Sequence, residues 1–167
     1  MKRILTFLAM LIPACGGNYP PLETVDSVDL DRYMGKWYEI ARLPNSFQED
    51  CWNSTAEYEI IDSETVRVIN RCEEDSAGGP IDEVTGKAWV VEGSNNAKLK
   101  VSFFWPFKGD YWILELDDEY RWVAVGTPSR EYLWILAREP EMEEEIYQSL
   151  LSKLSEKGFN VAQLIRR

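Results

Sequence analysis

The stretch GKWYEIARLPNSF, residues 35–47, contains the pattern that decides the fold. A glycine at position 35 precedes Trp37, and polar and apolar residues then alternate as far as Leu43, where a proline interrupts them. Alternation with a period of two residues is typical of a β-strand that buries one face. We therefore predict that residues 37–43 form the first strand of an antiparallel sheet.

Seven further runs with strand character follow at short intervals. They cover residues 55–61, 65–72, 84–92, 97–105, 111–116, 120–126 and 132–138. Short loops rich in turn-forming residues separate them, so each strand is expected to pair with the next one along the chain. Eight such strands without crossovers predict an all-β fold, an up-and-down antiparallel barrel able to hold one small ligand.

Residues before and after these strands predict two helical pieces. DLDRYMG, residues 29–35, could form one helical turn. Pro140 suits the first turn of a longer helix, and Gly158 is a typical stop after it. Apolar residues recur every four positions between these two limits, at Met142, Ile146, Leu150 and Leu154. One apolar face with an acidic opposite face predicts an α-helix packed on the outside of the barrel. The run 159–165 is expected to add an edge strand.

The N-terminus has the pattern of an export signal. Two basic residues precede an apolar run that ends near Ile12 and is too short to span a bilayer. The sequence IPACG around Cys15 resembles the bacterial lipoprotein lipobox, in which residues 1–14 are removed and the cysteine receives acyl chains such as palmitate. An ordinary signal peptide cut after Ala14 is the alternative. Residues 15–28 have the composition of a linker, and residues 29–167 form the predicted domain.

The charge of the chain limits its partners. Its formal charge is −11. The leader carries one lysine and one arginine, Lys2 and Arg3, so its removal would take the charge to −13. Such a surface repels nucleic acid phosphates and anionic lipid headgroups. Attachment to a membrane is therefore expected to come from the acyl chains. Because Gly16 is not the aspartate that retains lipoproteins in the inner membrane, we expect an outer-membrane anchor that faces the periplasm.

Two cysteines, Cys51 and Cys72, remain in the predicted domain. In an oxidising, exported compartment an even pair favours a disulfide, and two buried thiols are the alternative. The chain contains no histidine, so a histidine-based catalytic triad, histidine-ligated zinc and histidine-ligated haem are excluded. We expect no enzyme activity, no cofactor and no metal site.

Two motifs together resemble the lipocalin family. GKWYEIAR carries Gly35 and Trp37 at the start of the first strand, and YLWILAR ends the last strand with Arg138. The similarity extends over residues 29–167 and is to the bacterial outer-membrane and apolipoprotein D branches of the family, although Asp-Asp-Glu at 117–119 replaces the usual Thr-Asp-Tyr. The resemblance implies that Trp37 closes the narrow end of the barrel and that Arg138 lies across its indole. These three residues are therefore expected to be structural.

Strand alternation selects candidates for the interior. The lysines at 98 and 100 must face outward. Leu99, Val101 and Phe103, which alternate with them, therefore face inward. The same reasoning turns Tyr58 and Asn70 inward, whereas the sequence YWIL is too apolar for alternation to decide. The resemblance matches Tyr58, Asn70 and Trp134 to ligand contacts. The predicted ligand-binding residues are Tyr58, Asn70, Leu99, Val101, Phe103, Trp112, Leu114 and Trp134.

Such an interior suits a long apolar ligand with a polar end near the mouth. We predict a membrane-tethered lipid-binding protein that stores or transports fatty acids, phospholipids or lysophospholipids. The aromatic residues 103–107 are expected to form a lip that faces a membrane or a partner. A filled barrel that acts as an envelope interaction module is the alternative. The sequence leaves open which lipid is bound, in which direction it moves and whether two barrels form a homodimer.

Overall fold

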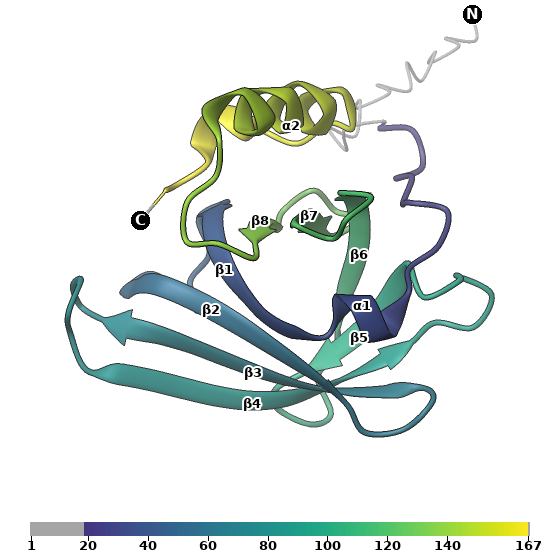
Figure 1. Cartoon of the computed structure of the whole chain (residues 1–167), viewed down its shortest axis with the longest axis horizontal. Helices are drawn as coiled ribbons and strands as arrows, with labels where there is room; N and C mark the ends of the chain where they lie inside the picture. Colours follow the sequence, from purple (N-terminus) through teal and green to yellow (C-terminus); the bar gives the residue numbers. More distant parts are fainter. Residues whose placement is uncertain (1–18, 167) are drawn as a thin grey trace, which may run out of the picture.

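The computed structural model describes residues 19–166, so the predicted leader and Cys15 lie outside the described residues. Eight antiparallel strands form one closed barrel in which every strand lies beside its neighbours in sequence, as predicted (Figure 1). The strands are β1 (Gly35–Arg42), β2 (Cys51–Ile60), β3 (Thr65–Glu74), β4 (Ile81–Val90), β5 (Lys98–Ser102), β6 (Gly109–Leu116), β7 (Trp122–Gly126) and β8 (Leu133–Ala137).

The loops alternate between two ends of the barrel because the strands run up and down. We call the end with the loops 43–50, 75–80, 103–108 and 127–132 the open end. The opposite end carries the other three loops and the predicted helical turn, α1 (Leu30–Tyr33), which lies beside the start of β1 (Figure 1). The buried side chains of Tyr33 and Trp37 fill this second end, which we call the closed end.

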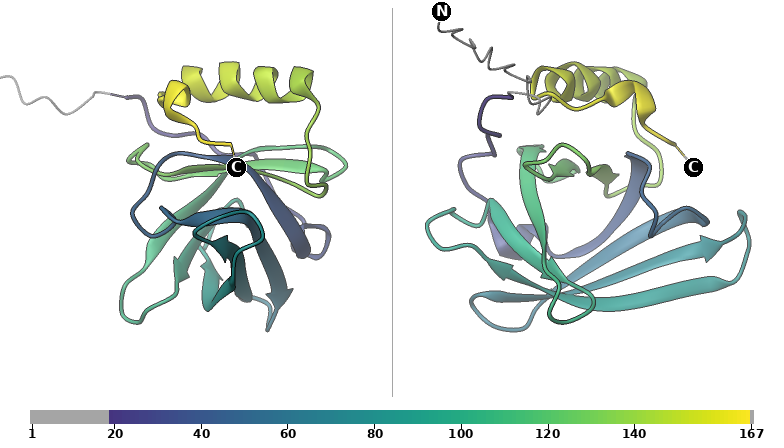
Figure 2. Two further views of the ribbon diagram at one scale, coloured as in Figure 1. Left: turned by 90° about the vertical axis from the view of Figure 1, so that its left-hand side faces the viewer. Right: turned by 180° about the vertical axis from the view of Figure 1, so that it is seen from behind.

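The apolar core has two layers, one inside the barrel and one between its wall and α2 (Glu144–Glu156). Leu150 and Leu154 of the helix pack against a cluster that includes Leu133 and Ile135 of β8, which confirms the predicted packing of the helix outside the barrel (Figure 2). The helix begins at Glu144, later than the predicted first turn at Pro140. The residues before it are needed to carry the chain from the end of β8 to the outer layer.

The predicted edge strand at residues 159–165 is wrong. The chain instead forms a 3₁₀ helix, η1 (Val161–Gln163), followed by a single bridge between Arg42 and Ile165. Phe159 is buried in the layer beneath the helix. Burying this ring turns the chain away from the extended path that an edge strand requires.

The described part of the expected linker lies against the barrel. Leu22 and Val28 are buried, and the backbone N–H of Val25 donates to the carbonyl of Ile113 on β6 at 3.0 Å. Leu22, Val25 and Val28 recur every three residues, which is not the period of two that marks a strand with one buried face, so these positions were assigned to the linker. The segment therefore runs over the barrel surface rather than standing free as a spacer.

A disulfide joins Cys51 at the start of β2 to Cys72 near the end of β3, with an S–S distance of 2.03 Å and a Cα–Cα distance of 5.3 Å. The predicted bridge is confirmed, and it fastens these two strands near the open end. Among residues 19–166, no helix is long and apolar enough to cross a membrane.

Candidate ligand-binding site

Trp37 forms the floor of the barrel at the closed end. Its side chain is fully buried, and its indole Nε1 donates to the carbonyl of Tyr33 at 2.9 Å. The guanidinium carbon of Arg138 lies 3.8 Å from the centroid of the indole. The predicted stacking of Arg138 on Trp37 is therefore confirmed, and such a contact contributes about 1–2 kcal/mol when it is partly desolvated.

Arg138 also ties separate segments of the closed end together. Its guanidinium donates to four backbone carbonyls at 2.8–3.3 Å, those of Arg32, Tyr33, Lys36 and Tyr120. Gly35 lies within this cluster with a φ of +89°, a conformation that a residue with a Cβ rarely adopts. The three signature residues thus lock the end of β8 to the start of β1 and make this end rigid.

Three tyrosine hydroxyls meet above this floor. The hydroxyl of Tyr111 lies 2.7 Å from that of Tyr33 and 2.8 Å from that of Tyr58. Burial raises the pKa of Tyr58 to about 12 and raises the pKa values of Tyr33 and Tyr111 well above their ordinary range. All three groups therefore stay protonated at neutral pH. Three O–H groups share two hydrogen bonds within the described residues, so one O–H remains free to donate to a ligand or water.

A small cavity of about 10 Å³ lies beside this cluster, deep inside the barrel. Its lining includes Tyr58, Leu99 and Val101, which were predicted to face inward. Val66 and Val68 share the inward face predicted for Asn70 and complete the wall, whereas sequence reasoning missed Tyr33, Tyr111 and Ile113. A cavity of this size holds one water molecule at most, so a larger ligand must occupy space nearer the open end or displace side chains.

The predicted inward orientation of Trp112 and Leu114 is wrong. Leu114 belongs to the buried cluster beneath α2, and Trp112 packs against the outside of the same cluster, where Lys98 lies over its ring at 4.1 Å. Tyr111 and Ile113 occupy the inner face instead. The pairing of β6 with β7 shifts between Ile113 and Glu115, and apolar side chains cover both faces of β6, so alternation of hydrophobicity does not reveal its orientation.

Phe103 and Asn70 lie farther toward the open end. A Cβ built on Gly86 would come within 2.7 Å of the Phe103 ring, so the absence of a side chain at Gly86 makes room for this ring. Phe103 packs against the inner core, as predicted. Asn70 follows Val66 and Val68 on the inner face of β3, and its buried Oδ1 has no hydrogen-bond partner within residues 19–166. An amide oxygen in this state is ready to accept a hydrogen bond from a ligand or water.

Trp134 stands at the open half of β8 and packs against the inner core, as predicted. Its indole Nε1 donates to Gln48 Oε1 at 2.9 Å, and its ring stacks on Tyr132 with 6.0 Å between centroids. The loop that contains Gln48 thereby fixes the orientation of the tryptophan. Phe47 of the same loop adds a ring 6.3 Å from that of Trp134.

A buried ion pair supports this loop. Arg42 pairs with Glu39, and their side chains are only 2% and 8% exposed. Arg42 also donates to the carbonyl of Gln48 at 2.6 Å, and the Gln48 amide donates to Glu39 at 3.1 Å. Sequence reasoning missed this network, although Glu39 lies two residues after Trp37 and therefore on the same face of the strand. The network holds the open end in shape and places charges close to the mouth.

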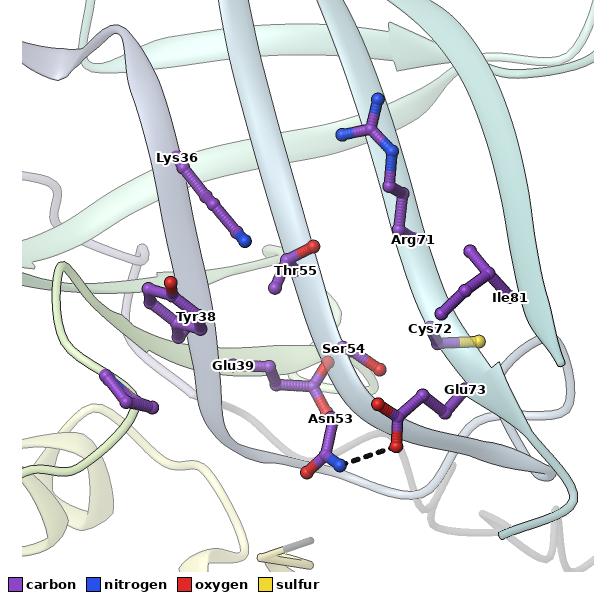
Figure 3. Close-up of a pocket in the computed structure, with 11 residues that line it drawn as sticks. Lys36, Tyr38, Glu39, Asn53, Ser54, Thr55, Arg71, Cys72, Glu73 and Ile81 are labelled. Atoms are coloured by element: carbon purple, nitrogen blue, oxygen red, sulfur yellow. Dashed lines mark hydrogen bonds between the residues drawn. The ribbon is translucent and has the colours of Figure 1, made fainter. Parts of the chain in front are cut away.

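A larger groove of about 380 Å³ lies on the flank of the barrel (Figure 3). It forms where β1 leaves β2, because β1 pairs with β2 only from Gly35 to Tyr38 and then turns to β8. Its lining combines apolar side chains such as Ile81 with the charged side chains of Lys36, Arg71 and Glu73. An apolar ligand would meet these charged groups in the groove, so the apolar barrel interior remains the candidate site.

A barrel that is sealed by packed aromatic rings at one end and lined by apolar side chains defines a class of proteins that bind small hydrophobic ligands. The comparisons agree with this class. Residues 28–167 match the lipocalin-like domain, and the chain belongs to the lipocalin family, whose members are non-enzymatic binding proteins.

Individual relatives place the chain within this family. It is 39% identical to the outer membrane lipoprotein Blc of Vibrio cholerae over 167 residues, which cover 99% of this chain and 97% of that protein. It is 31% identical to apolipoprotein D of Bos taurus over 87% of this chain and 78% of that protein. Among solved structures, insecticyanin from the tobacco hornworm Manduca sexta has a TM-score of 0.73 at 20% identity, covering 90% of this chain and 86% of that one. This last similarity concerns the fold alone.

Proposed function

We propose that this protein binds a fatty acid, a phospholipid or a lysophospholipid inside its barrel and stores or transports it in the cell envelope. The observation that carries the proposal is that the side chains of the inner wall change in type between the closed end and the open end. Aliphatic side chains such as Val66, Val68 and Leu99 surround the tyrosine cluster in the deep half, whereas Asn70 and Trp134 add polar groups toward the open end. Acyl chains suit the first region and a polar headgroup suits the second.

The proposal includes an anchor in the outer membrane, with the barrel facing the periplasm. The lipobox-like sequence around Cys15 supports it, as do relatives that are outer membrane lipoproteins. Several acyl chains on Cys15 would hold the protein at a lipid source, because each buried methylene contributes about 0.8 kcal/mol. Labelling cells with a palmitate analogue should mark the protein, and Cys15→Ser should abolish both the label and the membrane association. An unchanged label in this variant would exclude the anchor.

Native mass spectrometry of the protein extracted from membranes tests the ligand. We expect co-purified lipid, and we expect delipidated protein to take up a fluorescent fatty acid with saturable quenching of tryptophan emission. Protein that carries no lipid and shows no saturable change with any lipid offered would refute lipid binding.

A second function remains a candidate because the deep cavity holds only about 10 Å³. If side chains also fill the rest of the barrel, the protein would act as an interaction module of the envelope without a transported ligand. The same mass spectra distinguish the two functions. An interaction module would be extracted from membranes without bound lipid and together with its protein partner.

A further inference from the structure

The exposed apolar side chains gather at one end of the barrel. Eight large apolar residues are exposed within residues 19–166, and five of them lie on or directly beside three loops of the open end. We call these five the apolar rim: Phe47, Ile81, Phe104, Trp105 and Phe107, which are 62–77% exposed. Ile60 and Ile61 at the closed end are 43% and 42% exposed. A cluster of apolar side chains of this kind marks an interaction site.

The loop between β5 and β6 holds its three rings outward in a defined shape. The N–H of Phe107 donates to the carbonyl of Phe104 at 2.9 Å and closes a turn. Lys108 Nζ lies 5.2 Å from the ring centroid of Trp105 and 4.5 Å from that of Trp89 on the barrel wall. These contacts order the loop before any partner arrives, so binding costs little further conformational entropy.

The start of the described chain is fastened at the same end. Arg130, in the loop between β7 and β8, donates from Nη2 to the carbonyl of Pro20 at 2.7 Å, and its guanidinium lies 5.3 Å from the ring of Tyr19. Figure 2 shows this segment entering beside that end of the barrel. Three residues lie between Cys15 and Tyr19, so these two positions are about 14 Å apart at most when the chain is fully extended. An anchor at Cys15 would thus hold the open end close to the bilayer.

We propose that the apolar rim docks on a lipid bilayer surface, with the mouth of the barrel toward the membrane. Aromatic rings favour the headgroup region, where their apolar faces are buried while their edges stay hydrated. Asp50 and Asp75 are exposed on the rim loops, and the chain carries a formal charge of −11. The docking surface therefore suits zwitterionic lipid and is repelled by anionic lipid. This goes beyond the proposed function, because the rim can dock whether or not the barrel carries a ligand.

Vesicle flotation tests the docking without the acyl anchor. The chain from residue 15 with Cys15→Ser is mixed with phosphatidylcholine vesicles, or with vesicles in which about a third of the lipid is phosphatidylglycerol. We expect flotation with the first and weaker flotation with the second. Trp105→Ser with Phe107→Ser should lower the partition coefficient by about tenfold or more, since each removes a large exposed ring.

The matched control is Ile60→Ser with Ile61→Ser, which removes two exposed apolar side chains from the closed end. This control should float as the parent does. No flotation of the parent, equal loss in both double variants or tighter binding to the anionic vesicles would each overturn the docking. Uptake of a fluorescent fatty acid by the same proteins separates the two proposals, because a chain that floats without taking up lipid contradicts lipid binding alone.

Discussion

The two ends of the barrel differ in whether their buried polar groups have hydrogen-bond partners. At the closed end, Arg138 reaches four carbonyls and the indole of Trp37 has its own acceptor. Four buried side-chain atoms within residues 19–166 have no hydrogen-bond partner, and all of them lie on the end of β1, on β2, on β3 or on the loop after β1. They are Arg42 Nε, Asn45 Oδ1, Ser54 Oγ and Asn70 Oδ1.

Buried polar atoms without partners lower the stability of the fold but are available to bind a ligand. A buried polar atom without a partner costs about 1–3 kcal/mol, so the open half is less stable than it could be. Such atoms are tolerated where water or a ligand can satisfy them. The closed end therefore avoids this cost, and the open half keeps unsatisfied groups available for a ligand.

The largest effect is expected at the floor. Trp37→Ala should lower the free energy of unfolding by roughly 3–5 kcal/mol, because it empties a fully buried site and removes the partner of Arg138. Urea denaturation followed by circular dichroism measures this loss. Trp105→Ala is the control, since that ring is 75% exposed, and it should change stability by less than about 0.5 kcal/mol. Equal losses in the two variants would contradict the assignment of the floor.

The disulfide should have the next largest effect. Replacing Cys51 and Cys72 by alanine removes a bridge between positions 21 residues apart, which should cost about 3 kcal/mol in the chain-entropy model. Denaturation of the parent with and without a reductant should show a loss of the same size. A parent that resists denaturation equally well when reduced would show that the bridge does not stabilise the open end.

The tyrosine cluster makes the closed end sensitive to alkali. The folded-state pKa of Tyr58 is raised to about 12, above its unfolded value, so the stabilisation is complete at neutral pH and is lost as the pH rises through the folded pKa. The shift corresponds to about 2–3 kcal/mol. Stability measured from pH 9 to 12, with absorbance at 295 nm to follow ionisation, should fall steeply. Tyr58→Phe should make this fall shallower, and an identical fall would show that Tyr58 is not responsible.

The smallest change is expected at Asn70, and its sign is opposite. Asn70→Leu removes a buried amide whose oxygen has no partner, so it should stabilise the empty protein by about 1 kcal/mol. The same variant should bind a lipid with a polar headgroup more weakly. A destabilised variant would mean that an ordered water already satisfies the amide.

Most of the fold could be predicted from the sequence because short runs with strand character, separated by turns, are visible along the chain. The direction in which side chains face could be predicted only where one face of a strand meets solvent. Strands β6, β7 and β8 are apolar on both sides, and on β6 Trp112 and Leu114 face the helix layer while Tyr111 and Ile113 face the lumen. The buried ion pair of Glu39 and Arg42 was missed for a different reason. Charged residues on a strand are normally assigned to the solvent face, and only tertiary structure brings these two together.

The most direct test compares two tryptophans on opposite faces of the wall. Trp134 packs in the inner core and Trp112 in the layer outside it, and both are partly buried. Titration with a fluorescent fatty acid should show that Trp134→Ala raises the Kd by about tenfold or more, the effect of losing one large apolar contact, whereas Trp112→Ala leaves it unchanged. Equal effects of the two substitutions, or an effect of Trp112→Ala alone, would contradict binding inside the barrel.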